Sequence, residues 1–88
     1  MRLVFSGQAW DDYQYWLAND SDVLRRLNAL IRECQRTPFA GIGKPEPLKG
    51  DLRGWWSRRV TREDRLVYRV SGAGEDRMLE IAQCRLHY

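Results

Sequence analysis

The stretch Trp55-Trp-Ser-Arg-Arg-Val-Thr-Arg-Glu-Asp-Arg-Leu-Val-Tyr68 decides how the chain folds. It contains two runs of alternating residues joined at 61–64, a pattern typical of antiparallel strands with a tight connection. One alternating set is apolar: Trp56, Val60, Leu66, Tyr68 and Val70. The other set is mostly polar: Trp55, Ser57, Arg59, Arg65 and Arg69. If Arg59 faces Arg65, the apolar set covers the core and the arginines share the exposed face, whereas a one-residue slip would mix the sets.

Further patterns place this hairpin in an α+β fold with the element order βααβββ. We expect strands at 3–5, about 54–60, 65–70 and 78–87, with two helices between the first and second strands. That order predicts a mainly antiparallel four-stranded sheet with both helices packed on one face. Arg58 falls on the core side of its strand, where it must extend to the rim or find a partner.

Each predicted helix carries one apolar face. Ser6 can cap the first helix, and the helix is expected to pack through Trp10, Tyr13, Trp16 and Leu17. Residues 19–22 interrupt the pattern, and the second helix ends before Pro38. Its apolar face consists of Leu24, Leu27, Leu30, Ile31 and Cys34. In the last strand we expect Ala82, Cys84 and Leu86 to face inward, and Gln83, Arg85 and His87 outward.

Length and charge bound the kind of protein. With 88 residues, the chain has room for one domain, 1–88. The net charge of +3 is unevenly distributed. Residues 1–36 balance five arginines against five acids, while 37–88 carry ten basic and seven acidic residues. This asymmetry indicates an anionic partner at the second half of the chain.

Cysteine usage and hydropathy indicate the compartment. Cys34 and Cys84 stand far apart and fit buried free thiols in a reducing cytoplasm better than a disulfide. A single histidine and the absence of a Cys pair argue against zinc. The sequence contains no secretory signal and no apolar run long enough for a membrane span. We therefore expect a cytoplasmic protein that needs no metal or other cofactor.

The segment Gly41-Ile-Gly-Lys-Pro-Glu-Pro-Leu-Lys49 lies within a long predicted loop, 37–53. Loops of this length in a small domain are usually functional. The two flanking prolines bias Glu46 toward an extended backbone. A carboxylate on a stiffened loop beside an arginine-bearing strand pair suggests a site for a phosphodiester. The alternative is a solvated basic hairpin with a proline-rich surface loop.

Three motifs in order, Gly-Lys-Pro-Glu-Pro-Leu-Lys, Trp-Ser-Arg-Arg and Arg-Leu-Val-Tyr, precede a chain end that reads Cys84-Arg-Leu-His-Tyr88. Together with Trp10-Asp-Asp-Tyr-Gln-Tyr-Trp16, they closely resemble the YoeB toxins, ribosome-dependent messenger-RNA endonucleases of the RelE superfamily. The resemblance covers essentially the whole chain. It implies a metal-independent endoribonuclease that cuts messenger RNA in the ribosomal A site and is silenced by a YefM-like antitoxin. A homodimer is also consistent with the family.

Cleavage of RNA by its 2′-hydroxyl requires a base, cations at the phosphate and an acid for the leaving 5′-oxygen. Glu46 is the candidate base, and its alternative is a solvent-facing loop carboxylate. Arg59 and Arg65 are the candidate phosphate clamp, because a guanidinium can contact two phosphate oxygens at once; the alternative is a plain exposed hairpin face. Lys49 is a candidate to hold phosphate, to orient Glu46 or to contact the RNA backbone. Lys44 is a candidate backbone contact.

The resemblance places the general acid at His87, with Tyr88 as its orienting or base-stacking neighbour. The alternatives are that the chain end frays, or that Tyr88 supplies the proton. The sequence departs from the family at Asp64, where the family often has histidine, and in a longer turn at 71–77. A different class of function also fits the basic face: a non-catalytic module that binds RNA or the ribosome.

Overall fold

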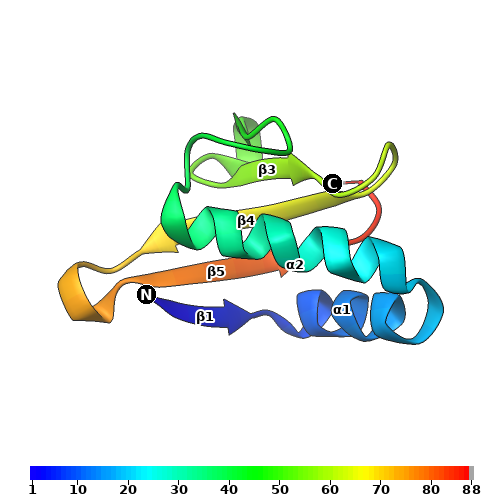
Figure 1. Cartoon of the computed structure of the whole chain (residues 1–88). Helices are drawn as coiled ribbons and strands as arrows, with labels where there is room; N and C mark the ends of the chain where they lie inside the picture. Colours follow the sequence, from blue (N-terminus) through cyan, green and yellow to red (C-terminus); the bar gives the residue numbers. More distant parts are fainter. Residues whose placement is uncertain (88) are drawn as a thin grey trace.

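The computed structural model describes residues 1–87. The elements are β1 (Arg2–Phe5), α1 (Gly7–Asn19), α2 (Ser21–Arg36), β2 (Glu46–Pro47), β3 (Trp56–Arg59), β4 (Arg65–Ser71) and β5 (Met78–Gln83), with short 3-10 helices at Gly50–Leu52 and Gly74–Asp76. The strands form one sheet in the order β1-β5-β4-β3-β2. β1 pairs with β5 in parallel, and the other pairs are antiparallel. Figure 1 shows α2 lying across the sheet, with α1 next to it. The predicted α+β fold is therefore confirmed.

Side chains fix where the two helices begin. The Ser6 hydroxyl accepts a hydrogen bond from the Ala9 amide at 3.0 Å, and the Asp20 carboxylate accepts one from the Val23 amide at 3.1 Å. Both contacts satisfy amides that a helix start leaves without an intrahelical partner. Because Asp20 ends one helix and caps the next, α2 can turn back over the sheet immediately after α1.

The core lies between the helices and the inner face of the sheet. From α2 it takes Leu27, Leu30, Ile31 and Cys34, and from the sheet Val60, Leu66, Tyr68, Leu79 and Ile81. The apolar face predicted for α1 was only half right. Trp16 is buried and Tyr13 half-buried, but Trp10 and Leu17 are 52% and 56% exposed. Trp10 instead stacks on Tyr13 at the surface, so the buried stripe of α1 is narrow.

The predicted register of the β3–β4 hairpin is confirmed. Arg59 pairs with Arg65, and Trp56 with Tyr68. The side chains of Leu66 and Tyr68 are therefore directed to the core, and the two paired arginines share the face opposite the helices. This outer face is where the candidate site lies.

Two features of the sheet differ from the prediction. It has a fifth strand, β2, because the extended backbone at Glu46 and Pro47 adds to the edge of β3. The last strand ends at Gln83 rather than at residue 87. Tyr68 pairs with Ile81 but Val67 pairs with Gln83, so Ala82 is an extra residue in a β-bulge. The bulge shifts the alternation: Ile81 and Cys84 are buried, and Leu86, which was predicted to face inward, is 57% exposed.

Candidate active site on the outer face of the sheet

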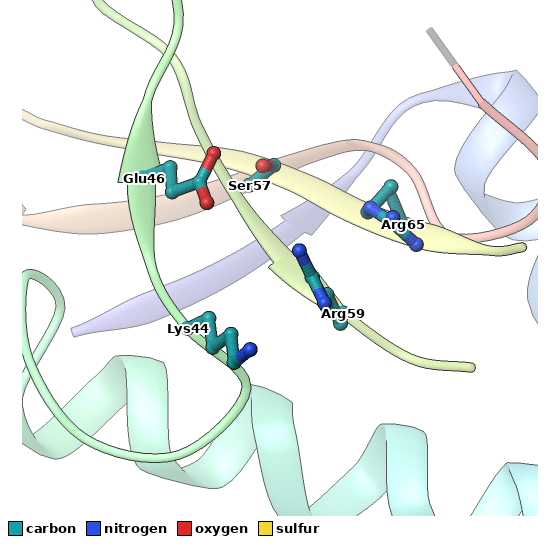
Figure 2. Close-up of a pocket in the computed structure, with 5 residues that line it drawn as sticks. All are labelled: Lys44, Glu46, Ser57, Arg59 and Arg65. Carbon is teal, nitrogen blue, oxygen red and sulfur yellow. The ribbon is translucent and has the colours of Figure 1, made fainter. Parts of the chain in front are cut away.

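An open cavity of about 90 Å³ lies on the outer face of the sheet. Its lining residues are Lys44, Glu46, Ser57, Arg59 and Arg65. In Figure 2 the Glu46 carboxylate and the Arg59 guanidinium extend into the same space from neighbouring strands. Three cationic side chains against one carboxylate make this cavity suited to an anion. Four of the site residues expected from the sequence thus come together here.

Strand pairing sets the position of Glu46. Its backbone is extended and pairs with Ser57 of β3, as the flanking prolines predict. Two residues later, the Leu48 amide donates to the Trp55 carbonyl at 2.9 Å, and the Leu48 side chain is buried. Glu46 is therefore held between two proline rings and a sheet edge, while its side chain stays exposed. Such a carboxylate is positioned in advance but remains open to a ligand.

The arginines of the hairpin differ in how they are held. The Arg59 side chain is exposed, and its amide donates to the Gly43 carbonyl at 2.7 Å, which joins the start of the loop to β3. Arg65 is half-buried. Its Nη1 donates to the carbonyls of Thr61, Arg62 and Asp64 at 3.1–3.2 Å. The turn at 61–64 therefore orients the Arg65 guanidinium before any substrate arrives.

Arg58 was missed as a site-forming residue. It was expected on the core side of its strand, where it would extend to the rim or find a partner. The structure shows the second outcome, because the side chain is fully buried and hydrogen-bonded. It donates to the carbonyls of Thr37, Ala40 and Ile42 at 2.6–2.9 Å, and to the Tyr68 hydroxyl at 3.1 Å. Residues 37–42 lead directly into the strand that carries Glu46, so one buried cation fixes the path of that loop. The strand alternation that directs Arg58 toward the core was the only indication of this role in the sequence.

The backbone of the loop approaches α2 closely at Gly43. Gly43 has φ +84°, and a Cβ there would lie 2.7 Å from Leu30 Cδ2 and 3.2 Å from Arg58 Cβ. Glycine is needed both for this positive φ and for the contact with α2. Lys44, which follows, also has a positive φ of 52°. The loop therefore turns sharply over Arg58 before it extends at Glu46.

The chain end is held although the strand stops at Gln83. On one side, the Cys84 amide donates to Asp12 Oδ2 at 3.0 Å, and Trp16 Nε1 donates to the Cys84 carbonyl at 2.9 Å. On the other side, the Arg65 amide donates to the Leu86 carbonyl at 3.0 Å. Gln83 Nε2 donates to the His87 carbonyl at 3.2 Å. The backbone is therefore tied down as far as His87, whose side chain is exposed.

Among the described residues, two predicted site residues, His87 and Lys49, do not line the cavity. Lys49 is exposed, immediately before the 3-10 helix Gly50–Leu52, and does not line the cavity. Tyr88 lies outside the described residues. Its predicted orienting or stacking role, like the choice between it and His87 as the proton donor, stays a prediction.

Burial raises the pKa of several weakly acidic groups that lie away from the outer face. It raises the pKa of the Cys34 thiol to about 11, that of the Cys84 thiol to about 12 and that of the Tyr68 hydroxyl to about 12. These groups are protonated near neutral pH, so neither cysteine is an activated nucleophile. Both are free thiols. Within residues 1–87 no three His, Cys, Asp or Glu side chains are grouped to hold a metal ion, and no helix is long and apolar enough to cross a membrane.

Comparison with known proteins places the chain in a family. Residues 5–88 match the YoeB-like toxins of bacterial type II toxin–antitoxin systems. The chain belongs to this family. It is 52% identical to the toxin YoeB of Escherichia coli K12, with both chains covered in full. The structure of a YoeB/ParE toxin from Agrobacterium tumefaciens superimposes with a TM-score of 0.97 at 57% identity, again over both complete chains.

Solved assemblies of a second YoeB family member are also similar. The YoeB dimer of Staphylococcus aureus has a TM-score of 0.88 and 42% identity, covering 100% of this chain and 98% of that one. The same toxin in a heterotetrameric YoeB–YefM toxin–antitoxin complex has a TM-score of 0.87 at the same identity and coverage. The S. aureus toxin thus occurs as a dimer and in complex with an antitoxin. The similarity of this chain to the family therefore includes the fold as well as the sequence.

Proposed function

We propose that this YoeB-family toxin is a ribosome-dependent endoribonuclease that cuts messenger RNA in the ribosomal A site. The observation that carries the proposal is the cavity in which one pre-positioned carboxylate faces three cations on an exposed sheet surface. A phosphodiester needs this combination: a proton acceptor for the attacking hydroxyl and positive charge for the phosphate oxygens.

In the proposed reaction, Glu46 removes the proton from the 2′-hydroxyl of the nucleotide before the scissile bond. The 2′-oxygen attacks the adjacent phosphorus, and negative charge increases on the non-bridging oxygens. Arg59, Arg65 and Lys44 stabilise that charge, each well-placed donor contributing on the order of 3 kcal/mol. The bond to the 5′-oxygen then breaks, and this oxygen takes a proton from His87. The products are a 2′,3′-cyclic phosphate and a 5′-hydroxyl.

The chain end supports the role of His87. The backbone of residues 84–87 is hydrogen-bonded to α1, to Gln83 and to β4. A general acid must approach the leaving oxygen within hydrogen-bond reach, directly or through one water, and an untethered end would not maintain that distance. We also propose that Tyr88 and Lys49 contact the RNA; Lys49 does so outside the cavity.

Glu46→Gln tests the proposal because it keeps the size of the side chain and removes the base. On purified ribosomes programmed with a messenger RNA, we expect the single-turnover cleavage rate to fall by about 10²–10⁴-fold, with ribosome binding unchanged. Glu75→Gln, in the exposed 3-10 helix Gly74–Asp76, is the matched control. Cleavage by Glu46→Gln at the unsubstituted rate would remove Glu46 as the base. Absence of cleavage by the unsubstituted toxin, with ribosome binding retained, would indicate a non-catalytic RNA- or ribosome-binding module instead.

The basic outer face also suggests how the toxin is silenced. We propose that an acidic, YefM-like antitoxin segment covers or distorts this face, and that the toxin forms a homodimer, as the S. aureus structures describe for that toxin. Affinity for an acidic antitoxin peptide should fall as salt rises. Affinity that does not change with salt would point to an apolar interface. The expected compartment is the cytoplasm, where ribosomes are available.

A further inference from the structure

Asp64 is a buried carboxylate that the proposed chemistry does not use. Asp64 is only 8% exposed and lies at the end of the turn between β3 and β4. Oδ2 accepts a hydrogen bond from the Thr61 hydroxyl at 2.5 Å, which closes the turn. Oδ1 accepts one from the Leu86 amide at 2.7 Å, which is 22 residues further along the chain. One carboxylate thus joins the turn to the chain end.

This contact lies between two groups of the proposed active site. Arg65 follows Asp64 in the chain, and its amide donates to the Leu86 carbonyl at 3.0 Å. Asp64 and Arg65 together therefore hold both polar groups of Leu86. The next residue is His87. Two consecutive residues, Asp64 and Arg65, thus set the position of Leu86 relative to the Arg65 guanidinium.

The backbone at Leu86 needs such contacts. Its φ is 64°, in the left-handed region that a branched residue rarely occupies. The Leu86 side chain is 57% exposed, so packing does not enforce this conformation. A residue in this region keeps it only where surrounding contacts hold it there. Without the Asp64 acceptor, Leu86 is expected to relax toward an extended backbone, which would turn His87 in a different direction.

We propose that Asp64 is a positioning residue: it holds Leu86 in its left-handed turn and so directs His87 toward the leaving oxygen. This inference rests on the proposed function, because it concerns the general acid of that reaction. It also gives a role to the position at which the sequence departs from the histidine often found in the family. Asp64 need not touch the substrate for this role.

The test compares Asp64→Ala with Glu63→Ala, its exposed neighbour in the same turn. Single-turnover cleavage is measured with the full-length toxin on programmed ribosomes, using messenger RNA with an oxygen or a sulfur as the 5′-bridging atom. Sulfur leaves with little protonation, so it bypasses the general acid. We expect Asp64→Ala to slow cleavage of the oxygen substrate by about 10²-fold, with KM unchanged, and the sulfur substrate to restore the rate. Glu63→Ala should match the unsubstituted protein on both substrates.

Asp64→Asn gives a second measure that does not depend on Asp64→Ala being folded. Its amide oxygen can still accept from Leu86, so a smaller loss is expected, again restored by sulfur. Hydrogen exchange at the Leu86 amide, measured by NMR in the free protein, should speed up in Asp64→Ala and less in Asp64→Asn. This readout needs no RNA and reports the hydrogen bond alone.

The outcomes separate this inference from the proposed function. If His87→Ala is slow but Asp64→Ala cleaves at the unsubstituted rate, Asp64 does not position the acid. A loss in Asp64→Ala that sulfur does not restore would mean that Asp64 acts through Arg65 or through folding, which also overturns the inference. If His87→Ala itself cleaves normally, the acid assignment of the proposed function fails, and the positioning role of Asp64 is overturned with it.

Discussion

Two irregular segments lead into the outer face, and they are held in opposite ways. The loop before Glu46 presents backbone carbonyls inward, and a single buried cation, Arg58, donates to three of them. The chain end before His87 presents backbone amides, and two buried carboxylates, Asp12 and Asp64, accept from them. The buried cation thus meets the partial negative charge of carbonyl oxygens, and the buried carboxylates meet the partial positive charge of amide hydrogens.

Because of this difference, we expect the two segments to respond differently when one of their contacts is removed. The loop depends on one side chain with several bonds, so losing that side chain leaves several buried acceptors without a donor at once. The chain end has its contacts spread over α1, β4 and Gln83, so losing one of them leaves the others. We expect cooperative damage in the first segment and local damage in the second.

Arg58→Lys should have the largest effect. A lysine ammonium cannot span the fork of acceptors that the guanidinium reaches, so we expect a loss of on the order of 3 kcal/mol in the free energy of unfolding. Urea titration followed by tryptophan fluorescence measures it. Arg59→Lys, one residue along but exposed, is the matched control and should change stability by less than about 0.5 kcal/mol. Equal losses in the two variants would remove Arg58 as the anchor of the loop.

Trp16→Phe probes the chain end and should have an intermediate effect. The variant keeps an aromatic ring in the core but removes the donor to the buried Cys84 carbonyl, which should cost about 1–3 kcal/mol. Faster hydrogen exchange should be confined to residues 84–87 rather than extend to the loop at 37–43. Faster exchange in both segments would contradict the expectation that losing one contact of the chain end has only a local effect.

A different kind of effect, with no change at neutral pH, should appear at alkaline pH. Cys34 lies beside Arg58 and Tyr68, while Cys84 belongs to the chain end, and burial raises the pKa of both thiols from 9.0, to about 11 and about 12. The unfolded state therefore loses these protons first, so the contribution of the two thiols to stability is constant well below pH 9 and falls above it, by about 1.4 kcal/mol per pH unit for each thiol. Urea midpoints from pH 8 to 10.5, under reducing conditions, should show this slope. Cys34→Ala and Cys84→Ala should each reduce it; an unchanged slope in either would argue against burial of that thiol.

The β3–β4 hairpin and much of the candidate site could be predicted from the sequence alone. A period of two places Arg59 and Arg65 on one face because successive strand residues point to opposite sides. Two prolines around Glu46 restrict its backbone to an extended form before any tertiary contact exists. The helix cap at Ser6 was readable for the same reason: it is an interaction between residues a few positions apart.

Features that depend on contacts between distant residues could not be predicted in this way. The bulge at Ala82 moves Leu86 out of the core, and strand alternation within one segment does not reveal it. The carbonyls that bind Arg58 lie 16–21 residues earlier in the chain, and the amide that binds Asp64 lies 22 residues later. Such contacts require the loop and the chain end to come together in three dimensions. That is why the partners of the buried Arg58, and the burial of Asp64, which the sequence does not distinguish from a surface charge, could be understood only from the folded chain.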